Sequence, residues 1–113
     1  MDPPVSLTPI PAGQVATIVT SLEMRARPKL RPLPASDLRL ARWTRPGLAR
    51  YRALFRRVGE PWLWFSRLVL PDADVSRTIE DERVHIFAVE DRAGIEVGML
   101  ELDFREPGQC ELA

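Results

Sequence analysis

The chain has 113 residues, of which 45% are hydrophobic, so it can form one modest core but not two ordinary domains. Its 16 basic and 16 acidic residues balance, so the whole chain has no net field that would draw it to nucleic acid or to an anionic membrane. It has one cysteine, no secretory signal and no apolar run of about 20 residues, which excludes an internal disulfide and a membrane span. We therefore expect a cytoplasmic protein.

Prolines divide the first part of the chain. Four of the 11 prolines fall within residues 1–11, which predicts an extended lead-in over residues 1–12 and a domain over residues 13–113. Residues 14–24 are rich in Val, Ile and Thr, which predicts a first strand. Three further prolines predict a connecting loop, after which Ser36 or Asp37 can cap a short helical turn that reaches Trp43.

The clearest helical pattern covers residues 45–58. Thr44 is the candidate cap and Gly59 the expected stop. The apolar residues recur at helical spacing and should face the core; they are Leu48, Tyr51, Leu54, Phe55 and Val58. The opposite face carries four arginines between residues 50 and 57, which we interpret first as a solvated face.

Two shorter elements are expected before the sheet resumes. Residues 60–70 contain an aromatic cluster that fits either a short helix or a wall of packed rings. Asp72 can cap a further helix that reaches about residue 81, with Val75 and Ile79 spaced to face the core.

The last third of the chain predicts strands. Residues 84–90 are apolar on both faces, and a turn over residues 91–94 leads into a return strand over residues 95–105, which makes a β-hairpin. Pro107 and Gly108 form a second turn before a short strand over residues 109–113. We interpret His85 as a packed or edge residue and Cys110 as a small buried side chain. The predicted fold class is α+β, a mostly antiparallel sheet of three strands plus a short fourth, with two or three helices between strands 1 and 2.

Three stretches of the chain are distinctive. They are residues 22–24 (Leu-Glu-Met), residues 59–68 (Gly-Glu-Pro-Trp-Leu-Trp-Phe-Ser-Arg-Leu), and residues 101–105 (Glu-Leu-Asp-Phe-Arg) followed by 111–113 (Glu-Leu-Ala). Together they resemble a bacterial branch of the GNAT-superfamily N-acetyltransferases. The resemblance covers residues 14–113, and the order of the predicted elements is that of the amino-terminal half of a GNAT fold.

The resemblance implies transfer of an acetyl group from acetyl-CoA to an amine acceptor, either a small molecule or a peptide. The family binds acetyl-CoA on a completed fourth strand and on a loop of the pattern Gln/Arg-x-x-Gly-x-Gly/Ala before a helix, whose amides hold the pyrophosphate. The six glycines of this chain stand alone, and no stretch has that pattern. We therefore expect an amino-terminal fragment that ends before the acetyl-CoA-binding motif, is inactive by itself and lacks a carboxy-terminal half.

Carboxylates on the return strand are the candidate catalytic groups. By strand geometry Glu101 and Asp103 lie about 7 Å apart on one face, and Glu111 returns on the adjacent strand. Such a cluster attracts an ammonium group, and mutual repulsion raises the pKa of at least one carboxyl toward that of a general base. We assign Glu111 and Glu101 to catalysis and Asp103 to acceptor binding. The alternative is that these side chains are solvated or pair with arginines on a helix.

Aromatic side chains are the candidate walls of the acceptor pocket. Trp62, Trp64 and Phe65 are close in sequence, and aromatic faces attract amines by cation–π interaction. The alternative role of each is core packing. No residue is assigned to a metal or to cofactor binding.

Two other classes of function remain open. An unfinished fourth strand leaves a sheet edge that can pair with another protein or with a second copy, which describes an interaction module. The arginine face over residues 50–57 is a candidate nucleic-acid surface. The balanced charge makes that second alternative the weaker one, and we predict neither a nucleic-acid nor a membrane partner.

Overall fold

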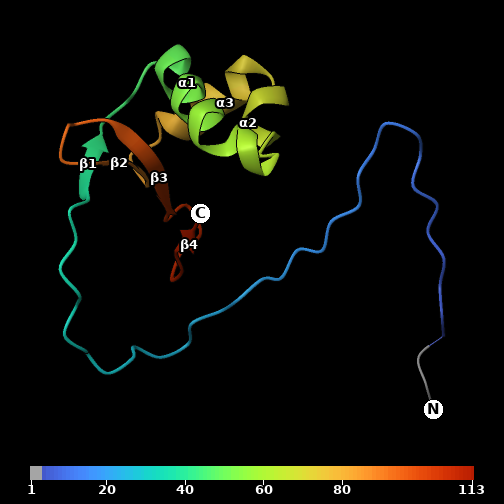
Figure 1. Ribbon diagram of the computed structural model, residues 1–113, viewed down its shortest axis with the longest axis horizontal. Coiled ribbons are helices and arrows are strands. Elements are labelled where there is room, and N and C mark those ends of the chain that lie inside the picture. The colour runs from blue at the N-terminus through green and yellow to red at the C-terminus, as the bar shows by residue number, and fades with distance from the viewer. Residues whose placement is uncertain (1–3) are drawn as a thin grey trace. The chain divides into compact units, whose positions relative to one another are not determined.

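The computed structural model describes residues 4–113, and the chain divides into one unit that ends at Leu33 and another from Pro34 to Ala113. The first unit is an extended chain, and none of its described residues, 4–33, lies in a helix or strand (Figure 1). The predicted strand over residues 14–24 is therefore wrong. Val15, Ile18 and Leu22 are 80%, 95% and 93% exposed. Apolar residues occupy both sides of the alternation in this stretch, so the pattern defines no single face that a sheet would bury.

The sheet begins with β1, Arg39–Trp43, where the sequence predicts a helical turn. That prediction is wrong, because the segment pairs antiparallel with β2, from Arg39 opposite Glu90 to Trp43 opposite Ile86. The Ser36 hydroxyl accepts a hydrogen bond from the Leu38 amide at 3.1 Å, so the local capping signal forms a turn before the strand. Tertiary pairing thus overrides a weak local preference.

Helix α1, Leu48–Gly59, supplies most of the helical side of the core. Tyr51, Leu54 and Phe55 are buried, and Leu48 and Val58 pack against them, so the predicted apolar face is confirmed. The predicted Thr44 cap is wrong: the helix begins after Gly47, and no side chain caps it. Gly59 is the last α-helical residue, one beyond the predicted end at residue 58, and Glu60 is the cap residue.

Three short elements connect α1 to the second strand. They are the 3-10 turn η1, Glu60–Trp62, and the helices α2, Ser66–Val69, and α3, Asp72–Ile79. Val75 and Ile79 of α3 are buried, which confirms their predicted core face. Asp72 does not cap α3, because Pro71 is the cap residue and Asp72 lies in the first turn, where its charge favours the helix dipole.

The sheet is four-stranded and antiparallel throughout, in the order β1-β2-β3-β4. Strand β2 is Val84–Glu90, β3 is Glu96–Asp103 and β4 is Glu111–Leu112. The hairpin of β2 and β3 is confirmed, with a bulge between Val89 and Glu90. All three α-helices lie between β1 and β2 in the chain, so the predicted α+β class is confirmed.

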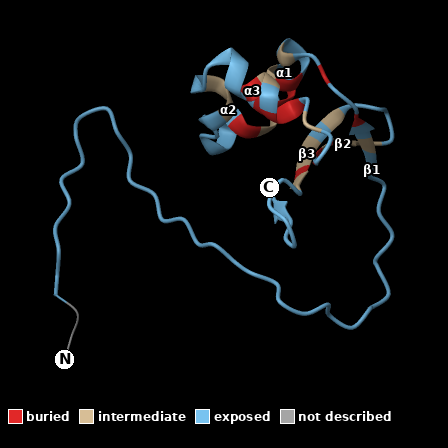
Figure 2. Ribbon diagram, turned by 180° about the vertical axis from the view of Figure 1, so that it is seen from behind, coloured by how far each residue is buried: buried red, intermediate tan, exposed pale blue. Residues whose placement is uncertain are grey.

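One face of the sheet is packed against the helices. Trp43, Val84, Ile86 and Ala88 are buried from this face together with the core residues of α1 and α3. The buried positions gather in these elements in Figure 2, whereas β4 is exposed. Glu101 on β3 lies opposite Ile86, so its side chain also points into this layer.

The sequence also makes predictions about the packing of His85 and Cys110. The His85 ring lies 5.0 Å from the Phe104 ring, centroid to centroid, which confirms a packed histidine. Cys110 is exposed, so the prediction that it is buried is wrong. The reason is that β4 pairs only on its β3 side, and among residues 4–113 no helix or strand buries the turn that precedes it.

Candidate functional site

The centre of the candidate site is a buried polar cluster of three residues: Tyr51, Arg67 and Glu101. The Tyr51 hydroxyl on α1 donates a hydrogen bond to Glu101 Oε1, and Arg67 Nη2 on α2 lies 3.3 Å from Glu101 Oε2. The side chain of Glu101 is only 9% exposed and that of Arg67 is 23% exposed. The cluster therefore joins two helices to the middle of the sheet, and both carboxylate oxygens of Glu101 have a donor.

Tyr51 acts in this cluster as a neutral donor. Burial raises the pKa of its hydroxyl, and the negative charge and hydrogen bond of Glu101 raise it further. The ring itself is fully buried and lies 6.2 Å from the Phe55 ring. Because a buried hydroxyl requires a partner, Tyr51 fixes the orientation of the Glu101 carboxylate.

Asp103 lies next on the same face of β3 and is held by Arg105. Arg105 Nε lies 3.0 Å from Asp103 Oδ1, and Nη2 lies 2.6 Å from Oδ2, a bidentate arrangement. The hydrogen bonds from Arg105 are the main reason that the pKa of Asp103 is lowered from its ordinary value. This direction is opposite to the one expected of a general base, so the predicted effect of carboxylate repulsion is not found at Asp103.

Glu111 returns beside Asp103, as predicted. The two residues are directly opposite in the antiparallel pairing of β3 and β4, so their side chains share a face of the sheet. Glu111 is exposed. Among the described residues, no side chain donates a hydrogen bond to its carboxylate. It therefore differs from Glu101 and Asp103, whose charges are compensated by arginine.

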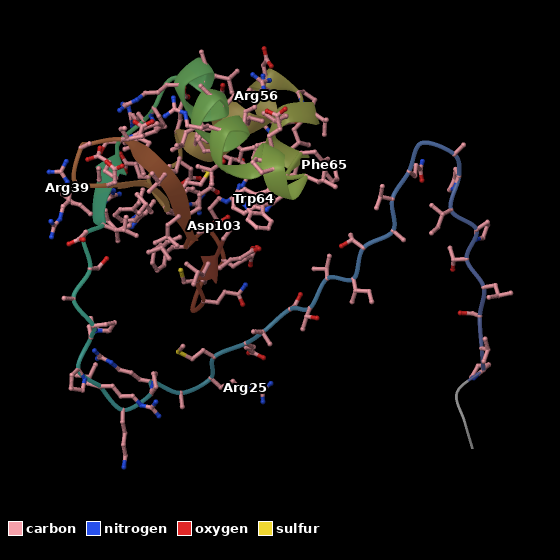
Figure 3. All side chains as sticks on the ribbon, viewed as in Figure 1. Arg25, Arg39, Arg56, Trp64, Phe65 and Asp103 are labelled. Carbon is pink, nitrogen blue, oxygen red and sulfur yellow. The ribbon has the colours of Figure 1, made fainter. Side chains whose placement is uncertain are left out.

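The aromatic cluster separates into a packed ring and an exposed pair. The Trp64 ring lies 5.9 Å from the Phe55 ring and rests against Gly59, so part of it packs on α1. Trp62 and Phe65 are 75% and 67% exposed. In Figure 3, Phe65 projects away from the sheet. The core-packing alternative thus holds for Trp64 in part, whereas Trp62 and Phe65 are each mainly exposed.

Arg67 is the link that the sequence interpretation missed. It follows the aromatic segment by two residues and pairs with Glu101, so it ties that segment to the predicted carboxylates. Arg52 supports the same region, because its guanidinium donates to the carbonyls of Arg67 at 3.1 Å and Leu70 at 2.8 Å. One feature of the sequence could have predicted a polar cluster here. Tyr51 lies on an apolar helix face, and its buried hydroxyl needs a polar partner on the sheet.

Other kinds of site are not apparent in the described part of the chain. Residues 4–113 contain no group of three or more His, Cys, Asp and Glu side chains placed to hold a metal, and no helix long and apolar enough to cross a membrane. Two open surface hollows are lined by residues 104 and 106–110 and by residues 37, 39 and 91–94, and neither contains a predicted site residue. Comparison of the chain with protein-family models, curated proteins and solved structures finds no match.

Proposed function

We propose that residues 34–113 form the amine-acceptor side of a GNAT-type N-acetyltransferase. The observation that carries the proposal is the element order: one strand, helices, then three antiparallel strands in sequential order. This is the order that the resemblance in the sequence implies for the first half of that fold. Two of the three stretches that carry the resemblance lie in this unit, where they supply the aromatic segment, β3 and β4. The remaining stretch, residues 22–24, lies in the first unit, so the proposal for residues 34–113 is supported by the other two stretches and by the element order.

Glu111 is the residue to which we assign proton removal from the incoming ammonium group. It is exposed and has no ion-pair partner among the described residues, so a cationic amine can reach it. Asp103 lies directly opposite on the same face, but its charge is compensated by Arg105, so Glu111 is the uncompensated carboxylate there. Trp62 offers an exposed aromatic face for the apolar part of the acceptor, whereas Phe65 projects away from the sheet. Glu101, closed off by Tyr51 and Arg67, positions the strand and the aromatic segment and does not contact the acceptor.

In this family acetyl-CoA supplies the acetyl group as a thioester. Residues 34–113 lack the glycine-rich loop and helix start that bind its pyrophosphate. The only described helices of eight or more residues are α1 and α3. The first follows the sequence Arg-Pro-Gly and the second the sequence Val-Leu-Pro, and neither contains the glycine pattern of a pyrophosphate loop. The proposal therefore assigns these residues to the acceptor alone.

Amine binding followed by NMR tests the proposal. Titration of the ¹⁵N-labelled chain with primary amines should shift the amide signals of residues 101–103 and 111–113 and the indole signals of Trp62 and Trp64. E111Q should weaken this binding, whereas E106Q, the same change in the exposed turn before β4, should not. Equal effects of E111Q and E106Q, or no shift with any amine, would contradict the assignment. A rise in the unfolding midpoint with acetyl-CoA would show that the chain binds the donor after all.

A second candidate function is strand-edge association. Strand β4 is at the edge of the sheet. The backbone hydrogen bonds between Ala113 and Glu101 show which of its backbone groups point toward β3. By the alternation of an antiparallel ladder, the Leu112 amide and carbonyl point outward and can accept another strand. L112P removes this outward donor without removing a bond to β3, so it should abolish self-association in sedimentation analysis. L112A keeps the amide and should not, and a monomeric wild-type chain would reject this function.

A further inference from the structure

The net charge of the chain is zero, but its two units have opposite net charges. Residues 1–33 have four basic and two acidic side chains, a formal charge of +2, and residues 34–113 have 12 basic and 14 acidic, a charge of −2. The four basic residues are Arg25, Arg27, Lys29 and Arg31. Charges separated by more than about 8 Å are largely screened in physiological salt. A basic segment in an extended unit therefore acts by its local charge and not by the chain average.

The basic residues alternate with small or apolar residues and are fully accessible. All residues from 25 to 31 are exposed, and Arg25 projects from the extended chain in Figure 3. Its one ion pair, with Glu23 at 3.3 Å, joins side chains that are 84% and 73% exposed and is therefore weak. Pro28 and Pro32 restrict the backbone to extended conformations. Four cations are thus presented within seven residues, and within residues 4–113 none of them has a strong ion-pair partner.

An apolar stripe precedes the basic residues. Val15, Ile18, Val19 and Leu22 recur at the spacing of one helical face, and each is at least 80% exposed in the extended chain. Pro11 and Gly13 precede this stripe and Pro28 follows it, so a helix over this stretch would have natural limits. Exposed aliphatic side chains beside a basic run are the pattern of a segment that folds on a lipid surface.

We infer that residues 14–31 bind an anionic membrane surface. The aliphatic stripe enters the boundary between headgroups and acyl chains as a helix, and the basic residues contact the anionic headgroups. A nucleic-acid partner fits less well, because residues 1–42 contain no aromatic side chain on which a base could stack. This surface binding is independent of the proposed acetyltransferase function.

Vesicle co-sedimentation with the full chain tests the inference. The probe is phosphatidylcholine vesicles with about one-third phosphatidylserine, compared with phosphatidylcholine alone. Each basic residue near an anionic surface strengthens binding about fivefold, so R25Q/R27Q/K29Q/R31Q should lose on the order of several hundredfold in affinity. The matched control, R45Q/R56Q/R57Q/R77Q, removes four exposed arginines from the second unit and should bind as the wild type does. Equal losses in the two variants would overturn the inference.

A second readout separates insertion from simple charge attraction. Circular dichroism should show new helix when the wild-type chain meets the anionic vesicles, and I18S/L22S should lose both this helix and at least tenfold in affinity. Failure to gain helix, or unchanged binding by I18S/L22S, would reject the apolar stripe as the inserting face. Single-stranded RNA is the competing probe: RNA binding as tight as vesicle binding at the same salt would assign the basic run to nucleic acid instead.

Discussion

Removal of the Arg67 guanidinium tests whether the polar cluster holds α2 to the sheet. R67Q leaves Glu101, whose side chain is 9% exposed, with the Tyr51 hydroxyl as its one remaining side-chain partner in the described part of the chain. Breaking a buried ion pair costs about 3–5 kcal/mol, and a hydrogen bond to a charged group is worth about 1.5–3 kcal/mol. Arg67 itself is 23% exposed, and solvent therefore replaces part of the lost interaction. We expect R67Q to lower the free energy of unfolding by about 2 kcal/mol.

Urea unfolding followed by tryptophan fluorescence measures this effect, because all three tryptophans lie in residues 34–113. With a slope of about 1–2 kcal/mol per molar urea, the midpoint should fall by about 1–2 M. The control R77Q breaks an exposed pair between Arg77 and Asp74 and should change stability by less than about 0.5 kcal/mol.

The double mutant R67Q/E101Q decides whether the loss comes from the pair itself. In the E101Q background no charge remains to be compensated, so R67Q should cost less than about 1 kcal/mol there. The two substitutions should therefore show a coupling energy of about 1 kcal/mol or more. Additive effects, within about 0.5 kcal/mol, would refute the reasoning, since they would mean that Arg67 stabilises α2 without its contact to Glu101.

Two further predictions follow from the packing and the charges of the same region. In G59A the new Cβ would lie 2.6 Å from the Trp64 Cβ, so the ring must move: we expect a loss of about 1 kcal/mol or more and a shifted tryptophan emission spectrum, and an unchanged spectrum would contradict the packing. Asp103 has a lowered folded-state pKa, so it contributes stability above its ordinary value of 3.8 and loses it as the pH falls through the folded value. D103N should therefore flatten the acid side of the stability profile below about pH 4, and an unchanged profile would show that the Arg105 contact is not maintained in solution.

The hairpin and the main helix could be predicted from the sequence because local and long-range preferences agree there. Asp91 and Gly94 close the turn: the Asp91 carboxylate accepts hydrogen bonds from the amides of Ala93 and Ile95 at 2.9 Å, and Gly94, which has no side chain, adopts a φ of +79°. In α1 the apolar spacing coincides with the face that the sheet covers. No tertiary contact had to override a local signal in either element.

The first strand and the partners of the carboxylates could not be predicted, for two different reasons. Residues 14–24 are rich in β-branched side chains, whereas residues 39–43, Arg-Leu-Ala-Arg-Trp, carry no clear strand pattern. Only the second stretch pairs with β2, so tertiary pairing and not local preference decides which one is a strand. The placement of Glu101 and Asp103 on one face followed from strand periodicity. Their neutralisation by Arg67 and Arg105 depends on where a four-residue helix and a turn lie in space, which no period in the sequence specifies.

The contacts of Glu101, Asp103 and Glu111 indicate which of the three carboxylates can act as a general base. A base needs a lone pair that the substrate can reach, and its pKa must not be held low by a fixed cation. Both oxygens of Glu101 accept from Tyr51 or Arg67, and both oxygens of Asp103 accept from Arg105. Glu111 alone among the three predicted acids is exposed, with no donor to its carboxylate among the described residues. The proposed acceptor site therefore requires that substitution of Glu101 mainly alter stability and that substitution of Glu111 mainly alter amine binding.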